Sequence, residues 1–295
     1  MRTLSMPEKS KGLAYIELTK PRITWMILVS TALGFFLGSK FNFDFNRFFW
    51  TLIGSGLVSS GSGALNHFAE EDSDRLMERT RSRPIQTGII SSDHVMYFGM
   101  VLILLGTAIL YFFVNPIVTV LALMTSLLYL FIYTPLKKIT WLNTTIGAIP
   151  GALPPVGGWV AGSGRLDPES WILFFILFFW QHPHFFAIAL MYRDDYKKAN
   201  LQMLPSIEET SSRTNRQIVW HLFLLIPVSL IPFYIGLLGK IYLVGAAILG
   251  LIYLASGLLM IKSYSLKSAK TLLRVSVVYL PVLFLIIIFD ILSLR

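Results

Sequence analysis

The sequence contains no cysteine and few charged residues. None of the 295 residues is Cys, which excludes a disulfide framework, a thiol nucleophile and a thiolate-ligated metal. Charged residues make up 14% of the chain, against roughly 25% in soluble proteins. Hydrophobic residues make up 55%, and the mean hydropathy is +0.66. These values exclude a water-exposed globular surface and a disordered chain, and they indicate an integral membrane protein.

Long stretches without charge predict nine membrane-spanning helices. A span needs about 20 mostly apolar residues. Eight stretches lack Asp, Glu, Lys and Arg, and they cover residues 23–39, 48–69, 94–136, 139–164, 170–192, 217–239, 241–261 and 275–289. The third is long enough for two spans, and Asn115-Pro116 near its middle is a turn signal. We therefore predict an all-α transmembrane bundle of nine helices, formed as a single domain over residues 1–295 with a lead at residues 1–21.

Positive charge is distributed unevenly between the two sides of the predicted bundle. If nine spans alternate in direction, twenty of the 25 Lys and Arg residues fall on the side of the N-terminus. Positively charged loops stay in the cytoplasm, so we expect a multi-pass protein of the cytoplasmic (inner) membrane with a cytoplasmic N-terminus. The long charged loops at 70–89 and 193–216 would be cytoplasmic too. The net charge of +9 predicts that the chain binds anionic lipid and an anionic substrate. We expect no nucleic acid as a partner.

Three oxygen-bearing side chains recur at four-residue steps where the second span ends. Asn66, Glu70 and Asp74 would share one face of a helix. An amide and two carboxylates suit Mg²⁺, which readily shares its ligands with phosphate. Arg79 and Arg83 follow and add the positive charge that a metal-bridged diphosphate needs. A solvated loop of paired charges is the alternative, but the position of Asn66 in an apolar span favours a functional site.

A second polar cluster lies where the sixth predicted span ends. His184 and Asp195 are eleven residues apart, which predicts a shared helical face, whereas His182 would point away. The clusters at 66–74 and 184–195 could then supply ligands from both sides of one metal site. Histidines satisfied within the bundle are the alternative. A zinc or heme-iron site made by both histidines is disfavoured because two residues of separation turns them to different sides of a helix.

Two further segments carry polar or small residues. Tyr133 and Lys137, followed by Lys138, close the fourth predicted span. Lys137 could reach a phosphate and Tyr133 could orient it, although a tyrosine and lysines are also common at a membrane edge. Residues 143–159 are rich in glycine and proline, which predicts a broken helix with close backbone packing.

Taken together, these segments resemble the UbiA-type intramembrane prenyltransferases. The first motif of that superfamily falls on Asn66, Glu70 and Asp74, and its Tyr-x-x-x-Lys motif falls on Tyr133 and Lys137. Six segments resemble, more specifically, the branch of the superfamily that transfers farnesyl to heme. They cover residues 18–22, 64–80, 143–159, 184–185, 192–196 and 203–205.

Two positions depart from the family pattern. The middle residue of the first motif is usually Asp, and here it is Glu70, whose carboxylate is one methylene further from the backbone. The second motif, two aspartates four residues apart, is incomplete because Asp195 has Met191 and Ala199 at those distances. Either Asp194 substitutes or one fewer carboxylate binds metal.

The resemblance implies a Mg²⁺-dependent enzyme with a central cavity open at the cytoplasmic side. Farnesyl diphosphate would donate its prenyl group to a vinyl group of heme b, giving heme O, and no redox cofactor is implied. A contact with heme A synthase or with terminal oxidase assembly is a further expectation. The implied metal ligands are Asn66, Glu70, Asp74 and Asp195; the implied diphosphate-binding residues are Arg79, Arg83, Tyr133, Lys137 and Lys138; and the implied heme contact is His184.

Two other functions fit part of the pattern. A related prenyltransferase acting on an aromatic quinone precursor would use the same metal and diphosphate residues, although the segments around Trp159 and His184 favour heme. A transporter with an acidic mouth is the second alternative. Transporters often contain two similar halves, and no repeat of whole segments is visible here.

Overall fold

The computed structural model describes residues 10–40 and 42–293, and helices are its only regular secondary structure. Residues 1–9 of the predicted lead at residues 1–21 therefore lie outside the described residues, and its described part contains α1. The helices are α1 (Lys11–Leu18), α2 (Pro21–Gly38), α3 (Phe45–Ala69), α4 (Glu71–Leu76), α5 (Ser92–Phe113), α6 (Pro116–Leu127), the π-helix η1 (Leu128–Tyr133), α7 (Thr134–Leu136), α8 (Asn143–Ala152), α9 (Pro154–Ser163), α10 (Ser170–Met191), α11 (Arg193–Lys198), α12 (Leu204–Ile207), α13 (Ser212–Tyr234), α14 (Lys240–Ser263) and α15 (Leu266–Ser293).

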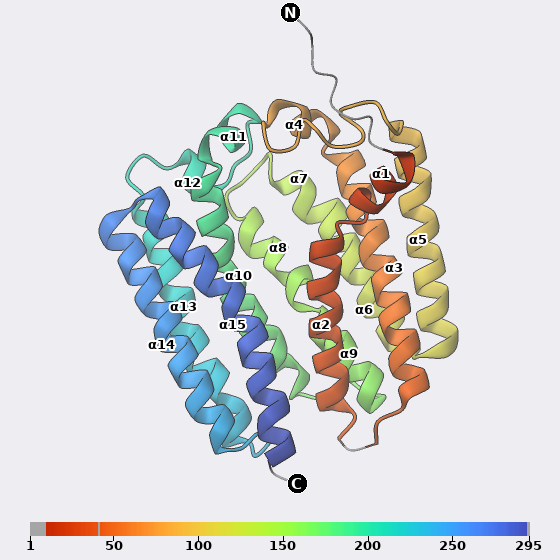
Figure 1. The fold of residues 1–295 in the computed structure, drawn as a ribbon, viewed down its shortest axis with the longest axis vertical. Coiled ribbons are helices and arrows are strands. Elements are labelled where there is room, and N and C mark those ends of the chain that lie inside the picture. Colours follow the sequence, from red (N-terminus) through yellow and green to blue (C-terminus); the bar gives the residue numbers. More distant parts are fainter. Residues whose placement is uncertain (1–9, 41, 294–295) are drawn as a thin grey trace, which may run out of the picture.

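The long helices run side by side in one bundle, and the short helices α4, α11 and α12 lie together at one end of it (Figure 1). Helices α2, α3, α5, α6 and α9 pack together on one side, and α10, α13, α14 and α15 pack together on the other. Helix α8 contacts both α10 and η1. The two long charged loops predicted from the sequence are therefore brought to the same end of the bundle.

Seven helices of the described chain are long and apolar enough to cross a membrane, with α6, η1 and α7 counted as one. They confirm the predicted all-α, polytopic membrane fold. The other two predicted stretches are also helical, as α3 and as the pair α8 and α9. Helix α3 has 25 residues and a length of about 37 Å, which exceeds the hydrocarbon core of about 30 Å.

Helix α3 is not among the seven long apolar helices, and it packs through small residues. Gly61 faces α5, where an added Cβ would lie 2.5 Å from the carbonyl oxygen of Gly99. Only glycine permits this approach of the two backbones, and small residues are the usual means of bringing membrane helices together. The polar composition of α3 thus reflects helix packing as well as its polar end at Asn66.

Several helices are interrupted, one within the bundle and others at the end that carries the charged loops (Figure 1). The predicted break within residues 143–159 is confirmed, because α8 ends at Ala152 and Pro154 begins α9. The π-helix η1 carries Tyr133 at its end, and such π-helical turns are frequent at functional sites. Helix α3 ends at Ala69 and α10 ends at Met191, so both acidic clusters begin where a long helix stops.

The last helix is longer than its predicted apolar core at residues 275–289. Helix α15 has 28 residues, from Leu266 to Ser293. Asp290 near its end is buried, and it accepts hydrogen bonds from the backbone N–H groups of Gly239 and, at 3.0 Å, of Tyr242. These N–H groups begin α14 and have no partner within that helix, so the carboxylate caps α14 at the opposite end of the bundle.

Candidate active site

Asn66 is held in one orientation near the end of α3. Its side chain is buried at 1% exposure, and its amide Nδ2 donates a 3.1 Å hydrogen bond to Oγ1 of Thr134. The Thr134 hydroxyl donates to the carbonyl oxygen of Tyr129 at 2.8 Å, so its lone pairs face the amide. This leaves the Asn66 amide oxygen as an acceptor, and it receives a hydrogen bond from Nζ of Lys20.

Glu70 pairs with Lys137 across the gap between α3 and α7. The carboxylate oxygen Oε1 lies 2.6 Å from Nζ of Lys137, and the two side chains are 12% and 14% exposed. Burial alone would raise the pKa of Glu70, but the charges of Lys137 and Lys20 outweigh it and lower that pKa. Burial also opposes the charge of Lys137, yet Glu70 raises the pKa of this lysine. Both groups therefore remain ionised at neutral pH.

Asp74 pairs with Arg83, and one of its oxygens has no partner. The side chain is 1% exposed, and its Oδ2 accepts a hydrogen bond from Nη1 of Arg83. Burial raises the pKa of Asp74, and the charge of Arg83 offsets this in part. The second oxygen, Oδ1, is buried without a hydrogen-bond partner in the described part of the chain. Buried acceptors of this kind are normally satisfied, so Asp74 retains an acceptor that the described residues do not use.

The prediction that Asn66, Glu70 and Asp74 lie on one continuous helix is wrong in detail. Helix α3 ends at Ala69, and Glu70 separates it from α4. Helical hydrogen bonds still run from Glu70 N to Asn66 O at 3.0 Å and from Asp74 N to Glu70 O at 2.8 Å. The three side chains therefore keep their four-residue steps through the break, and each of them contacts a cation from another segment.

Lys20 is a site residue that the sequence prediction missed. It lies between α1 and α2 in a left-handed backbone conformation with φ of 48°, which is uncommon for a residue other than glycine. Its Nζ contacts Asn66 and lies 3.4 Å from the Tyr129 hydroxyl. Burial lowers the pKa of Lys20 to about 7, against the opposing charge of Glu70. A lysine immediately before a proline-initiated span was the available signal in the sequence.

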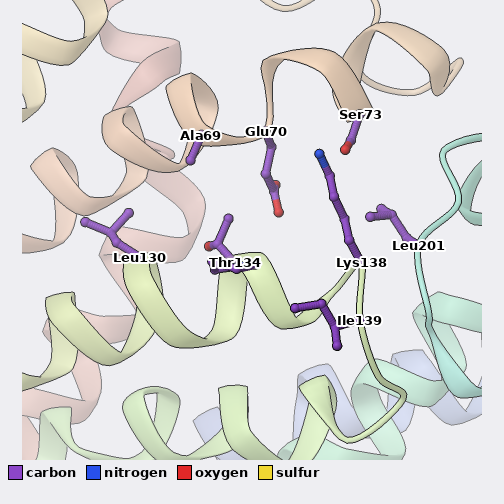
Figure 2. Close-up of a pocket in the computed structure, with 9 residues that line it drawn as sticks. Ala69, Glu70, Ser73, Leu130, Thr134, Lys138, Ile139 and Leu201 are labelled. Atoms are coloured by element: carbon purple, nitrogen blue, oxygen red, sulfur yellow. The ribbon is translucent and has the colours of Figure 1, made fainter.

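An open pocket of about 390 Å³ lies beside these ion pairs. Glu70 extends from one wall and Lys138 from the other, so that the two side chains reach toward each other (Figure 2). The volume falls within the range of ordinary ligand sites. The lining residues are Ala69, Glu70, Ser73, Leu130, Thr134, Pro135, Lys138, Ile139 and Leu201.

The ring of Tyr133 packs against the ammonium group of Lys137. The Nζ of Lys137 lies 4.4 Å from the centre of the Tyr133 ring, which is within the range of cation–π attraction. The ring also stacks on Tyr129, with centroids 5.6 Å apart. A Cβ at Gly147 of α8 would lie 2.4 Å from the Tyr133 ring, so the glycine makes room for the tyrosine.

The second acidic cluster joins the two charged loops. The two carboxylate oxygens of Asp195 accept hydrogen bonds from the backbone N–H groups of Glu78 and Arg79, each at 3.3 Å. The guanidinium of Arg79 donates to the Tyr196 hydroxyl at 2.9 Å, and it lies 5.0 Å and 4.9 Å from the ring centres of Tyr192 and Tyr196. The structure thus brings the clusters at 66–74 and 192–196 together through loop contacts.

The prediction that His184 and Asp195 share a helical face is wrong, because α10 ends at Met191 and Asp195 belongs to α11. Nδ1 of His184 instead lies 2.7 Å from Oγ of Ser276 on α15. His182 does point elsewhere, with its Nε2 3.3 Å from Oγ1 of Thr145 on α8. Its ring stacks on His221 of α13, with centroids 3.6 Å apart.

The donor set is compatible with Mg²⁺ bound together with a phosphate. Within residues 10–40 and 42–293, no three Asp, Glu or His side chains converge as a preformed metal centre. Mg²⁺ does not require one, since it is usually held by one or two carboxylates together with substrate phosphates and waters. Glu70 and Asp74 supply two carboxylates, and Asp74 has one unpartnered oxygen. Lys20, Arg83 and Lys137 contact the three oxygen-bearing side chains, and Lys138 lines the pocket beside them.

The sequence assigns the chain to a family whose solved structures share its fold. The sequence pattern of the UbiA prenyltransferase family matches residues 27–285, and the chain belongs to that family. The fold is similar to a digeranylgeranylglyceryl phosphate synthase, with a TM-score of 0.80 and 19% identity over 95% of this chain and 98% of that one. It is also similar to a UbiA homologue from Archaeoglobus fulgidus bound to DMAPP and Mg²⁺, with a TM-score of 0.64 and 18% identity over 92% of this chain and 98% of that one.

Curated relatives narrow the comparison to one enzyme. The protoheme IX farnesyltransferase of Solibacter usitatus is 46% identical over 285 residues, which cover 94% of this chain and 98% of that protein. The protoheme IX farnesyltransferase of Aquifex aeolicus is 39% identical over 271 residues, which cover 92% of each chain.

Proposed function

We propose that this chain transfers the farnesyl group of farnesyl diphosphate to a vinyl group of heme b, giving heme O and diphosphate. Family membership and the protoheme IX farnesyltransferases among its relatives support this reaction. The observation that carries it is the arrangement of Asn66, Glu70 and Asp74, which each contact a basic side chain beside an open pocket. Two of these basic side chains come from distant segments, and the third comes from the same loop as Asp74. Such a site can exchange its internal ion pairs for a metal and a diphosphate.

The proposal includes a topology. The chain forms one domain of nine spans, with α3 and the pair α8 and α9 completing the seven long apolar helices. The end that carries the pocket faces the cytoplasm, because the charged loops gathered there hold most of the Lys and Arg residues. A central cavity opens at that end and holds the farnesyl tail among the helices.

The diphosphate would be held at the mouth of this cavity. Asn66, Glu70 and Asp74 would hold Mg²⁺, which supplies charge neutralisation to the diphosphate oxygens when bound. Lys20, Lys137 and Arg83 would release their present partners and donate to the phosphates, and Lys138 would reach them across the pocket. These cations stabilise the negative charge that develops on the leaving diphosphate. Tyr133 keeps Lys137 in place during this exchange.

Asp195 acts chiefly through the loops in this scheme. Both of its oxygens already accept backbone hydrogen bonds at Glu78 and Arg79, so it joins the metal only through its remaining lone pairs. Its contacts, together with Arg79 between two tyrosine rings, fasten the loops over the mouth. Closing the mouth keeps water away from the reactive allylic cation.

The farnesyl group is transferred to heme b by formation of a carbon–carbon bond. Departure of diphosphate leaves an allylic cation on farnesyl, and the vinyl π electrons of heme b form a carbon–carbon bond with it. The positive charge then lies on the vinyl carbon next to the macrocycle, where water adds and loses a proton to give the hydroxyl group. We propose His184 as the residue that contacts the heme. A contact with heme A synthase or with terminal oxidase assembly would pass the product on within the bilayer.

The test is a reaction with purified chain in lipid vesicles, Mg²⁺, farnesyl diphosphate and heme b. We expect a heme product whose mass has increased by one farnesyl group and one hydroxyl group. A matched reaction with an aromatic quinone precursor tests the alternative acceptor. Prenylation of the aromatic compound but not of heme would contradict the proposed acceptor, and no release of diphosphate under any condition would contradict the enzyme itself.

A further inference from the structure

A hydrogen-bonded group of four side chains lies between α10, α14 and α15, away from the diphosphate pocket. His184 and Trp180 come from α10, Ser276 comes from α15 and Tyr253 comes from α14. The indole Nε1 of Trp180 donates to the carbonyl oxygen of Ser276 at 2.9 Å, and the Tyr253 hydroxyl donates to the carbonyl oxygen of Trp180 at 3.0 Å. Ser276 and Tyr253 are fully buried, so the group is fixed by its surroundings.

The hydrogen bonds determine which nitrogen of His184 carries the proton. Oγ of Ser276 lies 2.6 Å from the carbonyl oxygen of Leu273, and a hydroxyl has only one proton to donate. That proton is used on Leu273, so Oγ can only accept from Nδ1 of His184 at 2.7 Å. His184 is therefore protonated at Nδ1, and its Nε2 carries a free lone pair.

The orientation of the ring is fixed as well. The His184 ring stacks on the Trp180 indole, with centroids 5.0 Å apart and an interplanar angle of 25°. Among the described residues, no hydrogen-bond partner faces Nε2. A neutral imidazole with Nδ1–H bonded to an oxygen and Nε2 free is the form in which histidine binds a metal, and the oxygen partner orients the ring.

Resting on the proposed function, we propose that Ser276 is a positioning residue for the acceptor, because it holds His184 with Nε2 ready to bind the iron of heme b. His184 lies seven residues before the end of α10, which is about 10 Å along the helix. Iron held there would keep heme b on the side of α10 that packs against α15, about 10 Å from the end of the helix that carries the charged loop. Trp180 keeps the imidazole plane fixed during this binding.

Two other histidines provide a comparison within the same bundle. His182 and His221 also donate from Nδ1, to the carbonyl oxygens of Phe178 and Gln217, each at 2.7 Å. Their rings stack on each other, and Nε2 of His182 faces the Thr145 hydroxyl. His221 is the matched control, because its Nδ1 also donates to an oxygen and its ring is also stacked, but no side-chain hydroxyl of the described chain orients it. Replacing His221 should leave the iron contact at His184 unchanged.

The test measures binding of heme b and of iron-free protoporphyrin IX to the purified full chain by absorption spectroscopy. Ser276→Ala should weaken heme b binding by about 10- to 100-fold and shift the Soret band, as should His184→Ala. Affinity for protoporphyrin IX should stay at the wild-type value in both variants, because the lost contact is to iron. Ser276→Thr should restore heme binding, since it returns the hydroxyl.

Two controls separate positioning from packing. Ser229→Ala removes another buried hydroxyl, which lies 3.1 Å from the Tyr279 hydroxyl, and His221→Ala removes another histidine. Neither should change the Soret band. Equal weakening of heme b and protoporphyrin IX in Ser276→Ala would overturn the inference alone, as would a Soret shift in His221→Ala but not in His184→Ala. A wild-type chain that binds no heme at all would overturn the proposed acceptor together with the inference.

Discussion

The two acidic clusters look alike in the sequence, but the structure uses their carboxylates differently. Asp74 forms an ion pair with Arg83 and keeps one buried oxygen without a partner. Asp195 uses both oxygens on the backbone N–H groups of Glu78 and Arg79. A carboxylate with a free oxygen beside cations can take a ligand, whereas one bonded to backbone amides holds a loop in place. Position at the end of a long helix therefore does not decide the role of an acidic residue.

The difference comes from what other segments bring to each cluster. Lys20 and Lys137 reach the first cluster from 46 and 67 residues away in the sequence. The second cluster receives backbone groups of the loop that follows the first. The first cluster thus gathers cations from distant segments, and the second connects the two charged loops.

The largest expected effect tests whether both clusters face one compartment. The chain has no cysteine, so single cysteines can be introduced at Ser82 and at Lys198, which are both exposed. A membrane-impermeant thiol reagent should label both only from the cytoplasmic side, because positively charged loops stay there. Asn42→Cys, in the exposed α2–α3 connection, should be labelled only from the other side. Labelling of Ser82→Cys and Lys198→Cys from opposite sides would contradict the fold.

The next effect concerns the first cluster. Asp74→Asn should lower the rate of farnesyl transfer by about 10²- to 10³-fold, because it removes a charge that holds the metal and diphosphate in the transition state. Its volume is unchanged, so the variant should still insert and fold. The measurement is heme O formation with saturating substrates. Asp72→Asn, on the exposed side of the same short helix, should have the wild-type rate. A wild-type rate for Asp74→Asn would show that the cluster is a solvated loop without a role in the reaction.

A smaller loss is expected in the second cluster. Asp195→Asn keeps one acceptor oxygen for the loop backbone, so we expect a rate reduced by about tenfold, as is common when a supporting contact is lost. The Mg²⁺ concentration for half-maximal activity should stay at the wild-type value. Asp194→Asn, exposed in the same helix, is the matched control. A large rise in the Mg²⁺ requirement would instead place Asp195 on the metal.

The smallest effect concerns the support of the first cluster. Gly147→Ala places a Cβ 2.4 Å from the Tyr133 ring, and overpacking of this kind costs about 1–3 kcal/mol of stability. We expect a lower thermal midpoint and a raised KM for farnesyl diphosphate, because Tyr133 supports Lys137. Gly157→Ala, where nothing lies within 4 Å of the new Cβ, should not show either change. An unchanged KM for farnesyl diphosphate in Gly147→Ala would show that the position of Tyr133 does not affect diphosphate binding.

Much of the fold could be predicted because apolar runs and charged loops follow from the bilayer itself. Each of the eight uncharged stretches is helical over most of its length, and the proline- and glycine-rich stretch at 143–159 is broken as expected. The ends of the helices were harder. The breaks at Glu70 and Tyr192 carry no glycine or proline, so the sequence pattern continued each helix past its true end.

The sequence predicted the oxygen-bearing side chains of the candidate site better than it predicted the residues that contact them. Spacing alone identified Asn66, Glu70 and Asp74, since four-residue steps survive the break after α3. Lys20 was missed because its approach to Asn66 depends on the turn between α1 and α2. The partner of His184 could not be predicted either, because Ser276 is 92 residues away and only the packing of α10 on α15 brings them together.

The most direct test of the contrast between the clusters is Mg²⁺-dependent binding of farnesyl diphosphate to purified wild-type chain, Asp74→Asn and Asp195→Asn. Titration calorimetry with and without Mg²⁺ measures this binding without heme. The account predicts that Mg²⁺ strengthens binding to the wild-type chain and to Asp195→Asn by a similar factor, and that Asp74→Asn loses the strengthening. Equal loss in both variants, or no effect of Mg²⁺ on the wild-type chain, would contradict it.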